Sequence, residues 1–142
     1  MDILTVNNFF LDANDSIKNF NCYNINKSVK ILNYVLTNDG YDKFKLWVKK
    51  DINLTNIIDT INLSLKYISS CKSDLTSFYE KLSGSSVYSN WFDDIEVYSI
   101  DLTFISDTDY EAIISCGDTL IPDHLLEIYI DNNKITDIIL DG

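Results

Sequence analysis

The residue best suited to proton-transfer chemistry is His124, the only histidine of the chain. It follows Asp123, and a carboxylate that orients an imidazole is a common way to prepare a general base. No serine or cysteine occurs near His124 in a pattern typical of a nucleophile. A small enzyme that uses Asp123 and His124 is therefore one hypothesis, and a plain histidine at a strand edge is the other.

Metal and cofactor sites need patterns that this sequence lacks. Asp131, Asn133 and Asp137 offer oxygen ligands for calcium, but Ile135 occupies a ligand position of the EF-hand pattern and the glycine is missing. There is no C-x-x-C pair for zinc and no glycine-rich loop for a phosphate. Acid pairs are frequent, but glycosidase chemistry requires one carboxyl whose pKa burial raises. We expect no metal and no cofactor.

Acidic residues are concentrated in the last third of the chain. Residues 93–142 hold 13 of the 22 acidic residues and a single base, Lys134, whereas residues 1–92 hold nine acids and ten lysines. Such an asymmetry provides a negative surface, which serves either solvation or binding of a positively charged partner.

Aromatic residues accompany these acids, since Trp91-Phe92 directly precedes Asp93-Asp94. At a protein interface, aromatic rings supply buried area and carboxylates supply steering and specificity. The alternative is that these rings belong to the core. On the first interpretation, a basic protein would be bound by an aromatic anchor and six acids: Trp91, Asp93, Asp94, Glu96, Asp107, Asp109 and Glu111.

The composition is that of one folded domain spanning residues 1–142. Hydrophobic residues make up 46% of the chain, and with four glycines and one proline no linker marks a second domain. The N-terminal residues lack the features of a signal peptide, and no apolar run approaches the length of a membrane span. Three widely spaced cysteines, Cys22, Cys71 and Cys116, argue against a disulfide framework, so we expect a cytoplasmic protein.

The chain contains no arginine and has a formal net charge of −11. Without guanidinium groups it cannot form the bidentate hydrogen bonds by which arginine binds phosphate. We therefore expect no nucleic-acid binding.

Helical periodicity is clearest in the middle of the chain. Apolar residues predict a helix over 54–70, with Asn53 as the N-cap, and a second over 74–83, which Gly84 ends. A weaker period predicts a helix over 27–37 that ends at Asn38-Asp39-Gly40, followed by a strand over 42–50. A hairpin turn at Asn38-Asp39-Gly40 is the alternative for this region. Residues 3–6 suggest a short strand, and residues 7–26 read mainly as loop.

Alternation of apolar and polar residues predicts strands over 96–105, 110–116, 124–130 and 134–140. Short turns between them favour antiparallel pairing. The predicted class is α+β, an antiparallel meander sheet with helices packed on one face. Alternation then places acids on the side opposite the core, namely Glu96, Asp101, Glu111 and Glu127.

The segment Cys116–Gly142, CGDTLIPDHLLEIYIDNNKITDIILDG, resembles the ending of small bacterial domains of unassigned function. Some of these are similar to immunity proteins encoded beside polymorphic or contact-dependent toxins. The resemblance covers the last third of the chain and carries no site residues. It implies a small cytosolic protein that binds one toxin domain tightly.

These observations lead to one main hypothesis and two alternatives. The main one is an immunity protein that neutralises a basic, nuclease-type toxin domain by stoichiometric occlusion. A DNA-mimic inhibitor of a DNA-binding enzyme is the first alternative, and the small enzyme using His124 is the second.

Overall fold

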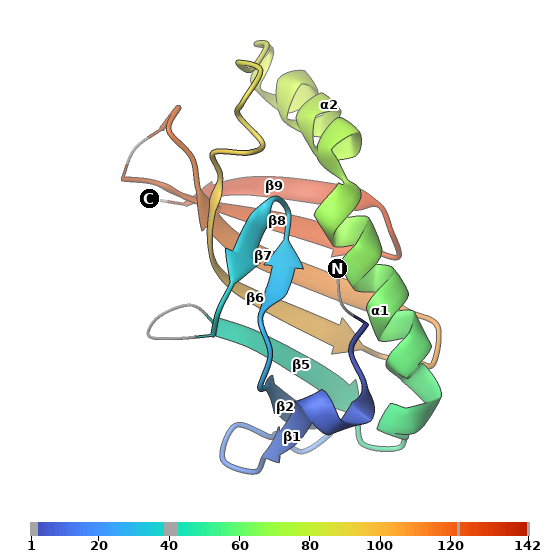
Figure 1. The fold of residues 1–142 in the computed structure, drawn as a ribbon. Coiled ribbons are helices and arrows are strands. Elements are labelled where there is room, and N and C mark those ends of the chain that lie inside the picture. Colours follow the sequence, from blue (N-terminus) through green and yellow to red (C-terminus); the bar gives the residue numbers. More distant parts are fainter. Residues whose placement is uncertain (1–2, 39–42, 122, 142) are drawn as a thin grey trace.

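The structure, a computed structural model, describes residues 3–38, 43–121 and 123–141 (Figure 1). Asp39 and Gly40 of the predicted turn, Asp42 at the start of the predicted strand, and Pro122 lie outside the described residues.

A mixed sheet of seven strands forms the centre of the molecule, in the order β1-β2-β5-β6-β7-β8-β9. Its strands are β1 (Phe9–Asp12), β2 (Phe20–Ile25), β5 (Lys43–Lys49), β6 (Glu96–Phe104), β7 (Tyr110–Gly117), β8 (Leu125–Asp131) and β9 (Ile135–Asp141). All neighbouring strands pair antiparallel except β5 and β6, which are parallel. The α+β class is confirmed, but an antiparallel meander does not describe the whole sheet. A parallel pair needs a long crossover, and the helical segment between β5 and β6 supplies it.

Two helices form that crossover, α1 (Leu54–Ser70) and α2 (Lys72–Ser83). Asn53 caps α1 by accepting a hydrogen bond from the Thr55 N–H at 3.0 Å. Gly84 ends α2 in the left-handed conformation, at φ 74°, where its N–H donates to the Glu80 carbonyl. The apolar stripe of α1 packs into the core through Ile57, Ile61, Leu65 and Ile68, all of which are fully buried.

Residues 27–37 form a hairpin and not the predicted helix. Strands β3 (Val29–Ile31) and β4 (Tyr34–Leu36) pair antiparallel across a two-residue turn, where Leu32 has φ 56°. The side chain of Leu32 is fully buried, so core packing holds a conformation that leucine rarely adopts. Val29 and Leu36 are also buried, and the same residues that suggested one helical face are the inward residues of the hairpin.

The N-terminal region also differs from the sequence prediction. The predicted strand over residues 3–6 is absent there, and Val6–Asn8 form a 3-10 turn instead. The region predicted as loop contains β1 and β2, which extend the sheet beyond β5. Phe9 and Ile25 of these strands join the core.

Among the described residues, the helices and the hairpin leave one side of the sheet without a layer of secondary structure. Figure 1 shows α1 and the β3–β4 hairpin in front of the sheet, while α2 runs on past the β9 edge, where it contacts β9. Helix α1 and the hairpin therefore lie on one side of the sheet, and the expectation that both helices pack on one face is not confirmed. We call the opposite side the open face. Neither described helix is long and apolar enough to cross a membrane.

Replacing Leu32 by glycine tests whether packing outweighs backbone strain in the hairpin. Glycine removes a left-handed strain of about 1–2 kcal/mol, but losing a buried leucine side chain costs about 2–5 kcal/mol. We expect Leu32→Gly to lower the free energy of unfolding in urea. Val35→Ala, at a residue 57% exposed on the same hairpin, should leave it nearly unchanged. A Leu32→Gly protein as stable as the wild type would mean that strain dominates.

Candidate functional site

Trp91, expected as an exposed anchor, is a core residue. Its side chain is 1% exposed, and its ring lies 4.7 Å, centroid to centroid, from that of Tyr79. Its indole Nε1–H donates to the Asp118 carboxylate at 2.7 Å, which satisfies the polar edge of the ring inside the protein. This burial agrees with the interpretation of Trp91 as a core residue and not with that of an exposed anchor.

Asp93 and Asp94 are exposed, but both carboxylates have partners within the chain. Asp93 accepts a hydrogen bond from the Asn33 side chain at 2.9 Å, and Asn33 belongs to the hairpin turn on the covered side of the sheet. Asp94 accepts from the Tyr88 hydroxyl at 3.0 Å. These contacts fix the segment that leads into β6 and turn Asp93 away from the open face.

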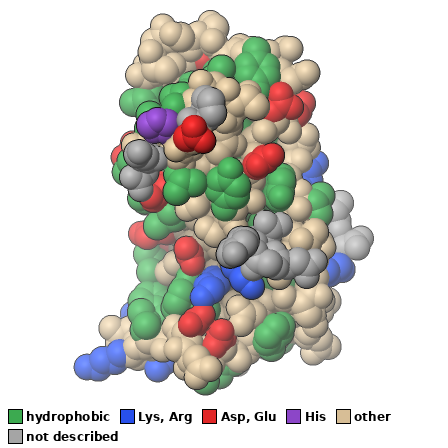
Figure 2. All heavy atoms as spheres, turned by 90° about the vertical axis from the view of Figure 1, so that its left-hand side faces the viewer, with side chains coloured by type: hydrophobic (Ala, Val, Ile, Leu, Met, Phe, Trp, Pro, Cys, Tyr) green, Lys and Arg blue, Asp and Glu red, His purple; other side chains and the backbone are tan. Residues whose placement is uncertain are grey.

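The remaining predicted acids lie at the two ends of β6. Glu96 is exposed at its start, opposite Gly117. Asp107 and Asp109 are exposed in the turn beyond its end, where Asp109 accepts from Ser106 and Asn132. Glu111 is exposed on β7. A nine-residue strand spans about 26 Å, so the predicted residues form separate groups. Figure 2, a view of one end of the sheet, shows acidic side chains interspersed with hydrophobic ones and not one continuous acidic surface.

The open face itself brings together residues that the sequence separates. The strand register aligns them in cross-strand rows, because paired residues point to the same side of a sheet. The first row is Asp12, Cys22, Trp47, Thr103, Glu111 and Asp131. The second row is Lys45, Asp101, Ile113, Tyr129 and Asp137. The third row is Lys43, Ser99, Ser115, Glu127 and Ile139.

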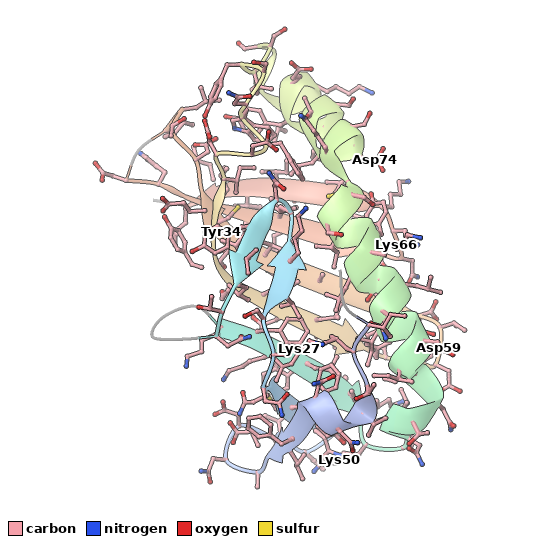
Figure 3. The ribbon with its side chains drawn as sticks, viewed as in Figure 1. Lys27, Tyr34, Lys50, Asp59, Lys66 and Asp74 are labelled. Carbon is pink, nitrogen blue, oxygen red and sulfur yellow. The ribbon has the colours of Figure 1, made fainter. Side chains whose placement is uncertain are left out.

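Charge divides this face into two halves. The β6–β9 positions of the three rows carry five carboxylates and no lysine, namely Asp101, Glu111, Glu127, Asp131 and Asp137. On β5 the same rows carry Lys43 and Lys45, and Lys45 forms an ion pair with Asp15. By contrast, the outer side of α1 carries both signs, where Asp59 and Lys66 point away from the sheet (Figure 3).

Glu111 and Asp131 stand directly opposite each other in the first row, and both are exposed. Side chains in this relation have Cβ atoms about 5 Å apart, and like charges there oppose strand pairing. Their neighbour Thr103 is neutral, and no lysine stands in this row. The register therefore places two like charges side by side on the open face.

Trp47 lies beside this acidic half and is half-buried on the open face. Its indole Nε1–H donates to the Asp101 carboxylate on β6 at 2.9 Å, which fixes the ring against the neighbouring strand. Ile17, Phe20, Trp47 and Thr103 line a shallow hollow of about 230 Å³. Sequence reasoning passed over Trp47, although its alternation with Lys45 and Lys49 already indicated the polar side of β5.

The loop between β1 and β2 positions one wall of that hollow. Asp12 accepts hydrogen bonds from the Asn24 side chain and from the N–H groups of Asp15 and Asn14, and these bonds hold the pKa of its carboxyl below the ordinary value. The Ser16 hydroxyl donates to the Asp12 carbonyl at 2.8 Å and accepts from the Cys22 N–H at 3.0 Å. The loop therefore folds back over Cys22 and places Ile17 beside Phe20.

Residues with potential for catalysis or metal binding do not converge. His124 is exposed at the start of β8, and the three thiols are buried. Within the described ranges, no group of three or more His, Cys, Asp or Glu side chains is placed to hold a metal ion. The arrangement that the structure does present is an open sheet face with clustered carboxylates and an aromatic residue.

Comparison with protein-family models, with curated proteins and with solved structures found no match to this chain.

The two tryptophans should differ in solvent access. We expect acrylamide to quench the fluorescence of the Trp91→Phe protein, which retains the half-buried Trp47, far more than that of the Trp47→Phe protein. Each variant reports on one indole, and circular dichroism checks that both retain the fold. Equal quenching of the two variants would contradict the burial of Trp91.

The buried thiols should make the protein less stable at alkaline pH. Burial raises the thiol pKa to about 11 for Cys22 and to about 12 for Cys71 and Cys116, from 9.0. Above pH 9 the unfolded chain therefore loses thiol protons that the folded chain keeps. The free energy of unfolding then falls as pH rises, by at most about 1.4 kcal/mol per pH unit for each thiol.

Urea unfolding between pH 8 and 10.5 measures this slope. The Cys71→Ser protein should show a shallower slope than the wild type, because one titrating thiol is missing. An unchanged slope would show that this thiol does not contribute to the pH dependence.

Proposed function

We propose that this protein is an immunity-type inhibitor, which binds a basic toxin domain through the acidic half of its open face and occludes it stoichiometrically. The observation that carries the proposal is the Glu111–Asp131 pair, two exposed carboxylates directly opposite each other with no lysine in their row. A fold gains nothing from that repulsion, whereas a cation from a partner placed between the two carboxylates relieves it.

The surrounding residues support a protein partner over a small molecule. The five carboxylates lie on four adjacent strands of an open sheet face. A flat, charged surface of this kind suits electrostatic steering of a basic protein, which raises the association rate. A nuclease-type toxin fits this description because its own site must attract phosphate. Carboxylates of the open face then take the place of nucleic-acid phosphates.

The proposed action is binding, in the cytoplasm, without catalysis. Three buried free cysteines suit a compartment that keeps thiols reduced. The resemblance of Cys116–Gly142 to immunity-type domains agrees with this assignment.

The test begins with capture of the partner from lysate of the source cell, with washes at low and high salt. The captured protein is then produced in recombinant form, and light scattering gives the stoichiometry of the purified complex. We expect a basic toxin domain in a 1:1 complex, and we expect co-expression of this chain to restore growth of cells that make the toxin. Capture of a DNA-binding enzyme would instead indicate that this protein is a DNA-mimic inhibitor. A captured protein that is neither basic nor inhibited would overturn the proposal.

Neutralising the opposed pair should have opposite effects on stability and on binding. We expect the double variant Glu111→Gln, Asp131→Asn to raise the free energy of unfolding by about 0.2–1 kcal/mol, because the cross-strand repulsion is removed. The same variant should bind the purified partner with a lower association rate at low salt, as measured by stopped-flow fluorescence.

The matched control for this double variant is Asp51→Asn together with Asp59→Asn, which removes the same charge from two exposed residues outside the three rows of the open face. It should change the association rate much less. Equal effects of the two double variants would mean that net charge alone matters, and the open face would lose its assigned role.

A further inference from the structure

We propose that the hollow beside Trp47 is the anchor site for the partner, and that it accepts a bulky apolar side chain flanked by lysine or arginine. This inference rests on the proposed function and specifies the chemistry of the segment that docks there. It replaces Trp91, which is buried, with an aromatic residue that solvent reaches.

The hollow has the composition of a binding hot spot. Ile17 and Phe20 line it from the β1–β2 loop and β2, Trp47 from β5 and Thr103 from β6. Ile17 is 56% exposed, so its side chain is available for contact with a partner. When a partner fills such a hollow, apolar side chains surrounded by polar residues form the arrangement in which a few side chains carry most of the binding energy.

Hydrogen bonds and an ion pair within the chain hold the walls of the hollow in place. The Trp47 indole is bonded to Asp101, and Lys45 in the next row is paired with Asp15 of the loop. Ile17 and Phe20 exchange backbone hydrogen bonds, which closes the loop that carries Ile17. A preorganised site loses little conformational entropy when it is filled, so its apolar contacts translate into affinity.

Charge decides which segment fits. Beyond Thr103, the first row continues with Glu111 and Asp131, so the hollow opens directly onto the opposed carboxylates. Across strands about 4.8 Å apart, Asp131 lies only about 10 Å from Thr103. A residue of opposite charge, one or two positions from the apolar side chain, spans that distance. On the other side, Lys49 of β5 disfavours a cation, so the basic residues of the partner must extend toward β7.

The test uses a phage-displayed library of random peptides, selected on the immobilised wild-type protein. We expect the enriched peptides to contain a bulky apolar residue next to lysine or arginine. Thr103→Phe fills the hollow without changing the charge. It should lower the affinity for a synthetic copy of the enriched peptide by about tenfold or more. Val35→Phe places the same ring on the exposed β4 strand and should leave binding unchanged.

Nuclear magnetic resonance then locates the bound peptide on the wild-type protein, so that no substitution can disturb the fold. The two indole N–H groups give separate signals, and titration should shift that of Trp47 and leave that of Trp91 in place. Peptides that bind Thr103→Phe as tightly as the wild type, or that shift neither signal, would overturn the inference.

The purified partner separates this inference from the proposed function. If the double variant Glu111→Gln, Asp131→Asn binds the partner more weakly and Thr103→Phe binds it as tightly as the wild type, the acidic half is the interface and the hollow is not its anchor. If neither variant affects the partner, both proposals fail.

Discussion

The parallel pairing of β5 with β6 is the constraint on which the rest of this fold depends. Two parallel neighbours cannot be joined by a tight turn, so the chain must cross from one end of the sheet to the other. Here the crossover contains both helices, and α1 buries its apolar stripe against the sheet on the same side as the hairpin. One side of the sheet is thereby covered, and no helix remains for the other side. The open face therefore exists because α1 of the crossover packs on the same side of the sheet as the hairpin.

Periodicity could predict the elements that bury a regular stripe. Helix α1 and strands β5–β9 were found because alternation or a helical period runs through them without interruption. The hairpin at residues 27–37 was missed because Val29, Leu32 and Leu36 satisfy a helical period while pointing inward from a tight turn. Strand β1, Phe-Phe-Leu-Asp, has no alternation of apolar and polar residues, and in β2 the half-buried Asn21 and Asn24 interrupt it. Their place in the sheet depends on pairing with β5, which local sequence does not reveal.

The composition of the open face was predicted in part, for a physical reason. Alternation placed Asp101, Glu111 and Glu127 on one side of the sheet, and the register aligns them there. Residues adjacent in sequence, however, alternate between faces or lie in turns, so a run such as Trp91 to Asp94 does not form one surface. Trp91 is buried, and its indole N–H is satisfied there by a hydrogen bond to the Asp118 carboxylate. Trp47 stayed at the surface because its row on β5 lies opposite the helical layer.

The distribution of charge argues against solvation as the sole reason for these acids. Solubility requires charges that are spread out, and it is served equally well by carboxylates in turns, such as Asp107. Placing Glu111 opposite Asp131 adds a repulsion that a lysine at either position would turn into an attraction. Lysine does occupy such positions on β5, where Lys45 stands opposite Asp101. The same sheet therefore pairs opposite charges where β5 meets β6 and keeps like charges together where β7 meets β8, and that contrast favours a binding role for the acidic half.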